Sequence, residues 1–291
     1  MDVASFLLLV LKSSIMLTVL AIGLNATVDD TLYLVRRPSL LLRSLLSMNV
    51  IMPLVAAALV VAFDLPTSVK VALVALAVSP VPPILPKKEL KAGGHEAYAI
   101  GLLVGVGVLA IVTVPIVVSW FIDAFDRTGS ISPLAVAKIV ATSVLAPLFV
   151  GIAIRAWAPT LAQHIARPAA MIGNVLLIAS ALPLIYATWP GISALFGNGT
   201  VLIVAAMAAT GLFTGHMLGG PDADDRTVLA LSTASRHPAI ALGAAVAAGE
   251  QSKTVLAAIL LYLVVAILIS IPYVAWRRRQ TAAAATSILS V

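Results

Sequence analysis

From Pro168 to Pro221 the chain contains no Lys, Arg, Asp or Glu, and a helix that spans a bilayer needs about 20 mostly apolar residues. Trp189-Pro190-Gly191 and Gly197-Asn198-Gly199 interrupt this stretch, so it predicts two spans with a turn between them. The whole chain is 61% hydrophobic and 10% charged, whereas soluble domains carry about 25% charged residues. This composition excludes a soluble enzyme or a nucleic-acid-binding protein and predicts an integral membrane protein.

Nine apolar segments predict an all-α membrane protein with about nine transmembrane helices. They cover residues 5–25, 39–62, 68–85, 97–121, 134–156, 168–188, 199–218, 226–248 and 254–276. The N-terminus differs from a signal peptide, because it starts with Asp2 instead of a basic region and because Lys12 interrupts the apolar run of the first segment. We therefore expect it to be the first span.

The net charge of +6 carries topological information, because Lys and Arg gather in cytoplasmic loops. Basic residues in one set of loops are Arg36, Arg37, Arg43, Lys87, Lys88, Lys91, Arg155, Arg167, Arg226, Arg277, Arg278 and Arg279, and those in the other set are Lys70, Arg127, Lys138 and Lys253. This asymmetry predicts a multi-pass protein of the inner (plasma) membrane, with its N-terminus outside and its C-terminus in the cytoplasm. An odd number of spans agrees with it.

The sequence indicates neither a metal site, nor a bound cofactor, nor an enzyme. It has no cysteine, which excludes thiolate metal sites and thiol catalysis, and its four histidines are more than 20 residues apart. The acidic residues all fall in predicted loops or at helix ends, and no acid/base pair is placed for chemistry. The expected partners are therefore the lipid bilayer and a small solute.

Two of the nine segments contain interruptions that ordinary helices do not have. The third ends in a proline-rich run near 79–88, with Ser79, Pro80, Pro82, Pro83 and Pro86, and the eighth is broken near 232–238 by Pro238. Proline removes an amide donor and clashes with the preceding turn, and non-helical backbone at membrane depth must be buried in protein or line a cavity. We expect residues 79–86 and 235–238 to be non-helical and to meet inside the protein. Broken helices at matching places indicate inverted repeats, here 1–128 and 129–291.

Arg236 lies within the eighth segment without an acidic residue nearby in the sequence. A cation at this depth normally faces a partner or a wet cavity. Its partners are either carbonyl groups at a helix end or an anionic substrate, and the second alternative predicts that its guanidinium faces a water-accessible cavity.

The segment from Ile22 to Pro53 and the two interrupted segments resemble the bile acid:sodium symporter family. The residues that carry the resemblance are Gly23-Leu24-Asn25-Ala26-Thr27-Val28-Asp29-Asp30, Arg37-Pro38, Ile51-Met52-Pro53-Leu54, the prolines after Ser79, and Ser235-Arg236-His237-Pro238. The resemblance implies a core domain with two discontinuous helices that cross at the midplane, and a panel domain made of the first, second, fifth and sixth spans. It also implies transport of organic anions such as bile acids, sulfated steroids and small carboxylates, driven by sodium.

The side chains that bind sodium in this family are not matched here. The positions that correspond to the family's ligands carry Leu85 and Pro86, Ala99 and Leu103, and Ser232 and Arg236. Of the side-chain ligands, only a hydroxyl at Ser232 or Thr233 could remain. The resemblance therefore implies the fold more firmly than it implies sodium coupling.

These observations predict a secondary active transporter of a small organic anion, in which Arg236 and Lys87 or Lys88 replace the charge of sodium. The candidate substrate-binding residues are Lys87, Lys88, Ser232, Thr233, Ser235, Arg236 and His237. The coupling ion is a proton, sodium or none, and His237 is either a proton carrier or a structural hydrogen-bond donor. The alternatives are a sodium-dependent organic anion symporter that uses backbone ligands, and a membrane sensor or partner protein that transports nothing.

Overall fold

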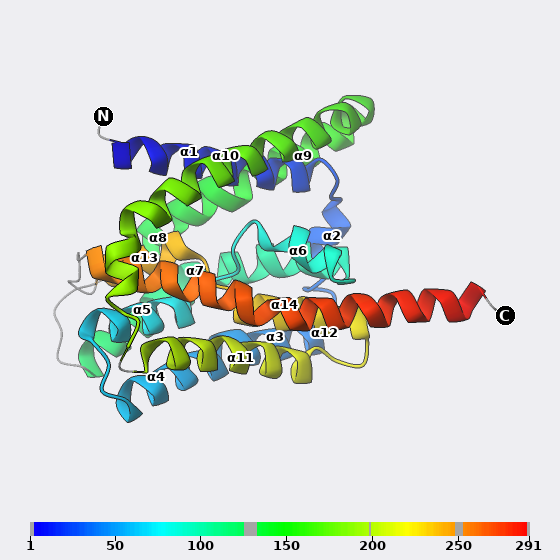
Figure 1. Cartoon of the computed structure of the whole chain (residues 1–291). Helices are drawn as coiled ribbons and strands as arrows, with labels where there is room; N and C mark the ends of the chain where they lie inside the picture. Colours follow the sequence, from blue (N-terminus) through cyan, green and yellow to red (C-terminus); the bar gives the residue numbers. More distant parts are fainter. Residues whose placement is uncertain (1–2, 125–132, 198, 248–252, 290–291) are drawn as a thin grey trace.

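The computed structural model describes residues 3–124, 133–197, 199–247 and 253–289, and the regular structure in these ranges is entirely helical (Figure 1). Within these described ranges, six helices are long and apolar enough to cross a membrane: Pro38–Ala62, Glu96–Trp120, Ala137–Trp157, Pro159–Ser193, Thr200–Leu218 and Lys253–Ala282. Leu9–Gly23 and Thr67–Val78 are shorter apolar helices. The predicted all-α membrane fold is confirmed.

The elements follow one another without a strand in the described residues. They are α1 (Val3–Gly23), α2 (Val28–Leu32), α3 (Pro38–Leu45), η1 (Leu46–Ile51), α4 (Met52–Ala62), α5 (Thr67–Val78), α6 (Leu85–Lys91), α7 (Glu96–Ala124), α8 (Pro133–Val140), η2 (Ala141–Leu145), α9 (Ala146–Trp157), α10 (Pro159–Ser193), α11 (Thr200–Leu218), α12 (Ala223–Ala234), α13 (Pro238–Ala247) and α14 (Lys253–Leu289). The short π-helical stretches η1 and η2 precede Pro53 and Pro147. A widened turn of this kind accommodates a proline inside a continuous helix.

Helices α1, α9 and α10 pack together as one layer, which lies at the top of Figure 1. Glycines permit this close packing, since a Cβ on Gly151 would lie 2.6 Å from the Leu20 carbonyl oxygen, and one on Gly173 would lie 2.8 Å from Thr18 Oγ1. The run α3–η1–α4 lies on the other side, where it packs against α5 and α11. The sequence analysis expected the second span to pack with the first, fifth and sixth spans in one panel domain. This expectation is wrong, because the second span, α3–η1–α4, packs against α5 and α11 instead.

The two broken segments meet in the interior, as predicted. Helix α5 ends at Val78 and α12 ends at Ala234. The amide of His237 donates to the carbonyl oxygen of Pro80 at 2.9 Å and to Ser79 Oγ at 3.1 Å. We call residues 79–84 the first break and residues 235–237 the second break.

Both breaks are shorter than predicted. Pro86 lies in the first turn of α6, and Pro238 is the first residue of α13. A proline at the start of a helix loses no hydrogen bond, because the amides of the first turn have no intrahelical partner. The prolines that the sequence analysis took as the ends of the breaks therefore begin the helices that follow them.

The predicted turn at Trp189-Pro190-Gly191 is also wrong, because α10 continues through Pro190 to Ser193. The chain turns after this point, and Gly199 precedes α11 with a φ of 73°, a conformation that glycine adopts without strain. The division of the chain into inverted repeats at residues 1–128 and 129–291 stays a prediction.

Candidate functional site

Arg236 and His237 lie at the contact between the two breaks, and each is 1% exposed. Nη1 of Arg236 donates to the Ser79 carbonyl oxygen at 3.2 Å, whereas Nε and Nη2 have no hydrogen-bond partner. Both ring nitrogens of His237 also lack a partner. Among the described residues, Arg236 forms no ion pair. An unpaired buried cation is costly and requires an explanation.

The guanidinium does not face an open cavity in this conformation, contrary to the expectation for Arg236. Hydrogen bonds to Ser79 and Pro80 join the second break to the first, and the side chains of Arg236 and His237 are both buried. The hydroxyl of Tyr262 on α14 donates to the carbonyl oxygen of Ala234 at 2.9 Å and satisfies the end of α12. The conformation is therefore one in which the Arg236 region is closed.

Ser232 and Thr233 point to two different neighbours and do not gather around Arg236. Ser232 Oγ donates to Oε1 of Glu89 at 2.5 Å, and Thr233 Oγ1 lies 2.8 Å from Ser47 Oγ on η1. Both residues are fully buried, and Ser235 is partly buried. Of the predicted substrate-binding residues, the structure brings Arg236 and His237 together with the first break.

Glu89 is a site residue that the sequence analysis missed. It lies on α6, and its side chain is 0% exposed, although the sequence placed every acidic residue in a loop or at a helix end. Its Oε2 has no hydrogen-bond partner, and it forms no ion pair within the described parts of the chain. No local signal identifies it, because Leu85–Lys91 reads as a polar loop and its burial depends on packing against α12.

Lys87 belongs to a second feature, a cavity of about 380 Å³ between the α1–α9–α10 layer and the α6–α7 segment. Its polar lining includes Asn25, Lys87, Glu96 and Arg155, and Lys87 Nζ donates to Asn174 Oδ1 of α10 at 3.4 Å. Lys88 is half-buried and is not part of this lining. Arg155 and Asn25 were missed, since they are far from Lys87 in the sequence.

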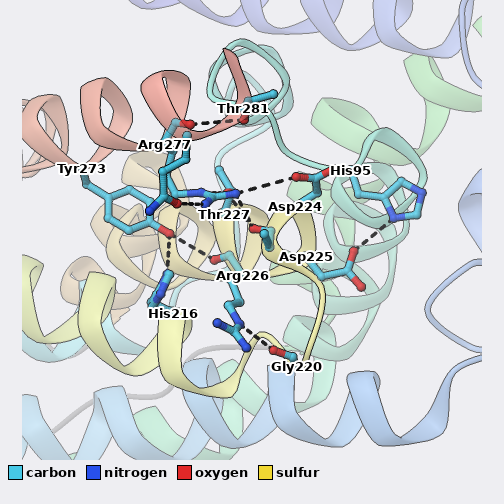
Figure 2. Close-up of polar contacts among 12 residues, drawn as sticks. His95, His216, Gly220, Asp224, Asp225, Arg226, Thr227, Tyr273, Arg277 and Thr281 are labelled. Atoms are coloured by element: carbon cyan, nitrogen blue, oxygen red, sulfur yellow. Dashed lines mark hydrogen bonds and ion pairs between the residues drawn. The ribbon is translucent and has the colours of Figure 1, made fainter. Parts of the chain in front are cut away.

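The amino end of α12 is held by side chains from α14 and by His95 (Figure 2). Arg277 is 4% exposed and fully partnered: Nε donates to Thr227 Oγ1 at 2.7 Å, and Nη2 donates to the Ala223 carbonyl oxygen at 2.9 Å. His95 Nδ1 lies 3.1 Å from Oδ1 of Asp225. Burial raises the pKa of the Asp225 carboxyl, and the contact with His95 opposes this shift. This network fixes α12 in place beside α7 and α14.

The comparisons with known proteins agree with this architecture. The model of the sodium bile acid symporter family matches residues 13–186, a range that includes the first break, Glu89 and the lining of the cavity. The second break lies beyond the matched residues. A search of curated proteins found no match.

Proposed function

This chain belongs to the sodium bile acid symporter family, and from that premise we propose that it is a secondary active transporter of small organic anions. The observation that carries the proposal is Arg236, a buried guanidinium at the contact of the two breaks with two donor nitrogens that lack partners. A bidentate carboxylate is the partner whose shape matches these donors. In this proposal the missing partner is the substrate, which reaches Arg236 when the breaks separate.

The cavity lined by Lys87 and Arg155 is the proposed entry site. Its volume of about 380 Å³ falls in the range of ordinary ligand pockets. Two cations and one carboxylate, Glu96, leave its lining with a positive balance, which attracts an anion. Because the cavity lies between the α1–α9–α10 layer and α6–α7, movement of that layer would open or close it, as alternating access requires.

Classical sodium coupling does not suit the residues at the breaks. A sodium ion about 4 Å from the Arg236 guanidinium would be repelled by about 4 kcal/mol at an effective dielectric constant of 20. At 1.4 kcal/mol for each factor of ten, this repulsion weakens binding by nearly three orders of magnitude. The family name favours the second candidate, sodium-dependent symport through backbone carbonyls, in which Arg236 would have to point away from the ion.

We also propose that the protein lies in the inner (plasma) membrane with its N-terminus outside and its C-terminus in the cytoplasm. The support is the asymmetric distribution of Lys and Arg between the two sets of loops. Cysteine residues introduced into the cysteine-free chain at Asp64 and at Asp224, which are both exposed, should be labelled from opposite sides of the membrane.

The function is tested by uptake into proteoliposomes that contain the purified protein. The probes are radiolabelled cholate, a sulfated steroid and pyruvate, each measured in sodium, potassium and choline media. We expect uptake of at least one probe to persist in all three media. Uptake that stops when sodium is replaced would instead establish the sodium-dependent alternative, and no uptake of any of the three probes would contradict the proposed substrate class.

A further inference from the structure

Glu89 occupies an unusual position for a carboxyl group. It is completely buried, its Oε1 accepts a hydrogen bond from Ser232, and its Oε2 has no partner. Its helix, α6, directly follows the first break, and Ser232 lies in the last turn of α12, just before the second break. The contact between Glu89 and Ser232 therefore joins α6 and α12, the helices that flank the two breaks, and the breaks separate in the proposed transport cycle.

Glu89 forms no ion pair within the described residues, and the cation that interacts with it electrostatically is Lys88. Lys88 is the adjacent residue on α6, and consecutive residues on a helix do not face each other. On the elements packed against α6, the titratable side chains include Glu96 and Tyr98 on α7 and Asp224, Asp225 and Arg226 on α12. The Tyr98 hydroxyl bonds to Ser44, and Asp225 contacts His95. Nε of Arg226, the cation among them, donates to the Gly220 carbonyl oxygen, and Arg226 forms no ion pair with Glu89 in the described residues. A buried carboxylate without a cation is strongly disfavoured, and such a group becomes neutral by taking up a proton.

We propose that Glu89 is the proton-binding site of this transporter: it holds a proton in the closed conformation described here and releases it when α6 separates from α12. Binding forms an O–H bond on one carboxylate oxygen, and release returns the proton to water. This inference rests on the proposed function, because the proton takes the place of sodium as the coupled cation. It assigns the coupling role to Glu89 and leaves His237 as a buried neighbour of the first break.

Protonation of Glu89 is measured on the purified protein by infrared difference spectroscopy, without any substrate. At pH 6 the wild-type protein should show the carbonyl stretch of an un-ionised carboxylic acid, which is separate from the bands of carboxylates. Glu89→Gln should remove this band and should still fold, since its amide oxygen can accept the hydrogen bond from Ser232. Ser232→Ala should shift the band without removing it, because the hydrogen bond to Oε1 is lost. The control Asp64→Asn, at an exposed carboxyl between α4 and α5, should leave the band unchanged.

Coupling is measured in proteoliposomes with pyruvate and cholate as probes and with an imposed pH gradient, alkaline inside. For one proton carried per monovalent anion, the wild-type protein should accumulate the probe about tenfold for each pH unit. Glu89→Gln should still exchange the probe across the membrane but should not accumulate it.

Absence of the band from the wild-type protein, or its persistence in Glu89→Gln, would overturn the proposal. Accumulation that ignores the pH gradient would overturn it as well. If neither probe is taken up by the wild-type protein, that substrate class is refuted, while the infrared band alone still decides whether Glu89 binds the proton.

Discussion

Exchanging Arg236 for methionine tests whether this arginine serves transport or stabilises the fold. Arg236 has one hydrogen bond, to the Ser79 carbonyl oxygen, and two buried donors without partners. Losing a hydrogen bond from a charged group costs about 1.5–3 kcal/mol, and each unsatisfied buried donor costs about 1–3 kcal/mol. Arg236→Met removes the bond and both unsatisfied donors, so the free energy of unfolding should change by between about −1 and +4.5 kcal/mol.

Arg277 provides the matched control, since it is also buried but has partners for all three of its nitrogens. Arg277→Met leaves Thr227 Oγ1 and the Ala223 carbonyl oxygen without their donor. At about 1.5–3 kcal/mol for each hydrogen bond from a charged group, we expect a loss of about 3–6 kcal/mol. Unfolding in mixed micelles of dodecylmaltoside and increasing SDS measures both variants.

Transport then decides the role of Arg236. Arg236→Met should abolish uptake of the probe anions while the free energy of unfolding falls by no more than about 1 kcal/mol. Arg236→Lys should restore only part of the uptake, because lysine lacks the planar fork of donors. An Arg236→Met protein that is as destabilised as Arg277→Met and transports normally would show that the guanidinium has a structural function and that our reasoning is wrong.

Two further predictions concern the cavity and the packing of the α1–α9–α10 layer. Lys87→Gln and Arg155→Gln should each raise the KM for the probe anion about tenfold, which corresponds to about 1.4 kcal/mol. An unchanged KM in both variants would exclude the cavity that these two residues line from the substrate route. Gly151→Ala places a Cβ 2.6 Å from the Leu20 carbonyl oxygen and should destabilise the protein by about 1–3 kcal/mol. The control Gly107→Ala, whose added Cβ has its nearest neighbour 3.7 Å away, should have little effect. Equal stabilities of the two variants would contradict the packing of α1 against α9.

The sequence predicts the breaks because their cause is local. The cluster of prolines after Ser79 removes several amide donors within two turns, which a helix does not tolerate. A single proline is a weaker signal, because α10 continues through Pro190. The exact ends of the breaks were predicted less well, because a proline is equally compatible with a break and with the first turn of a new helix. Pro86 and Pro238 take the second option.

The interior partners could not be predicted from the sequence, because they depend on tertiary packing. Glu89 stands in a short polar segment, and only the packing of α6 against α12 makes it a buried carboxyl. Lys87 and Arg155 line one cavity although they lie on helices far apart in the chain. The placement of α3–α4 beside α11 likewise follows from contacts between distant elements.

The charges of Arg236 and Glu89 provide a physical basis for coupling an anion to a proton. Glu89 contacts Ser232, which lies four residues before Arg236, so both charges act on the same short segment of α12 and the second break. With Glu89 neutral, Arg236 leaves this region positive and favours an anion. With Glu89 ionised, the two charges offset each other, and the attraction for an anion is lost.

Linkage is reciprocal: if a proton on Glu89 strengthens anion binding by some factor, the bound anion strengthens proton binding by the same factor. We therefore expect the infrared titration of Glu89 to move to higher pH when saturating pyruvate or cholate is added, by one pH unit for each factor of ten in affinity. The same anion should bind more tightly at pH 6 than at pH 8 to the wild-type protein, and equally tightly at both pH values to Glu89→Gln. A Glu89 titration that does not move when a transported anion is bound would show that the two charges act independently.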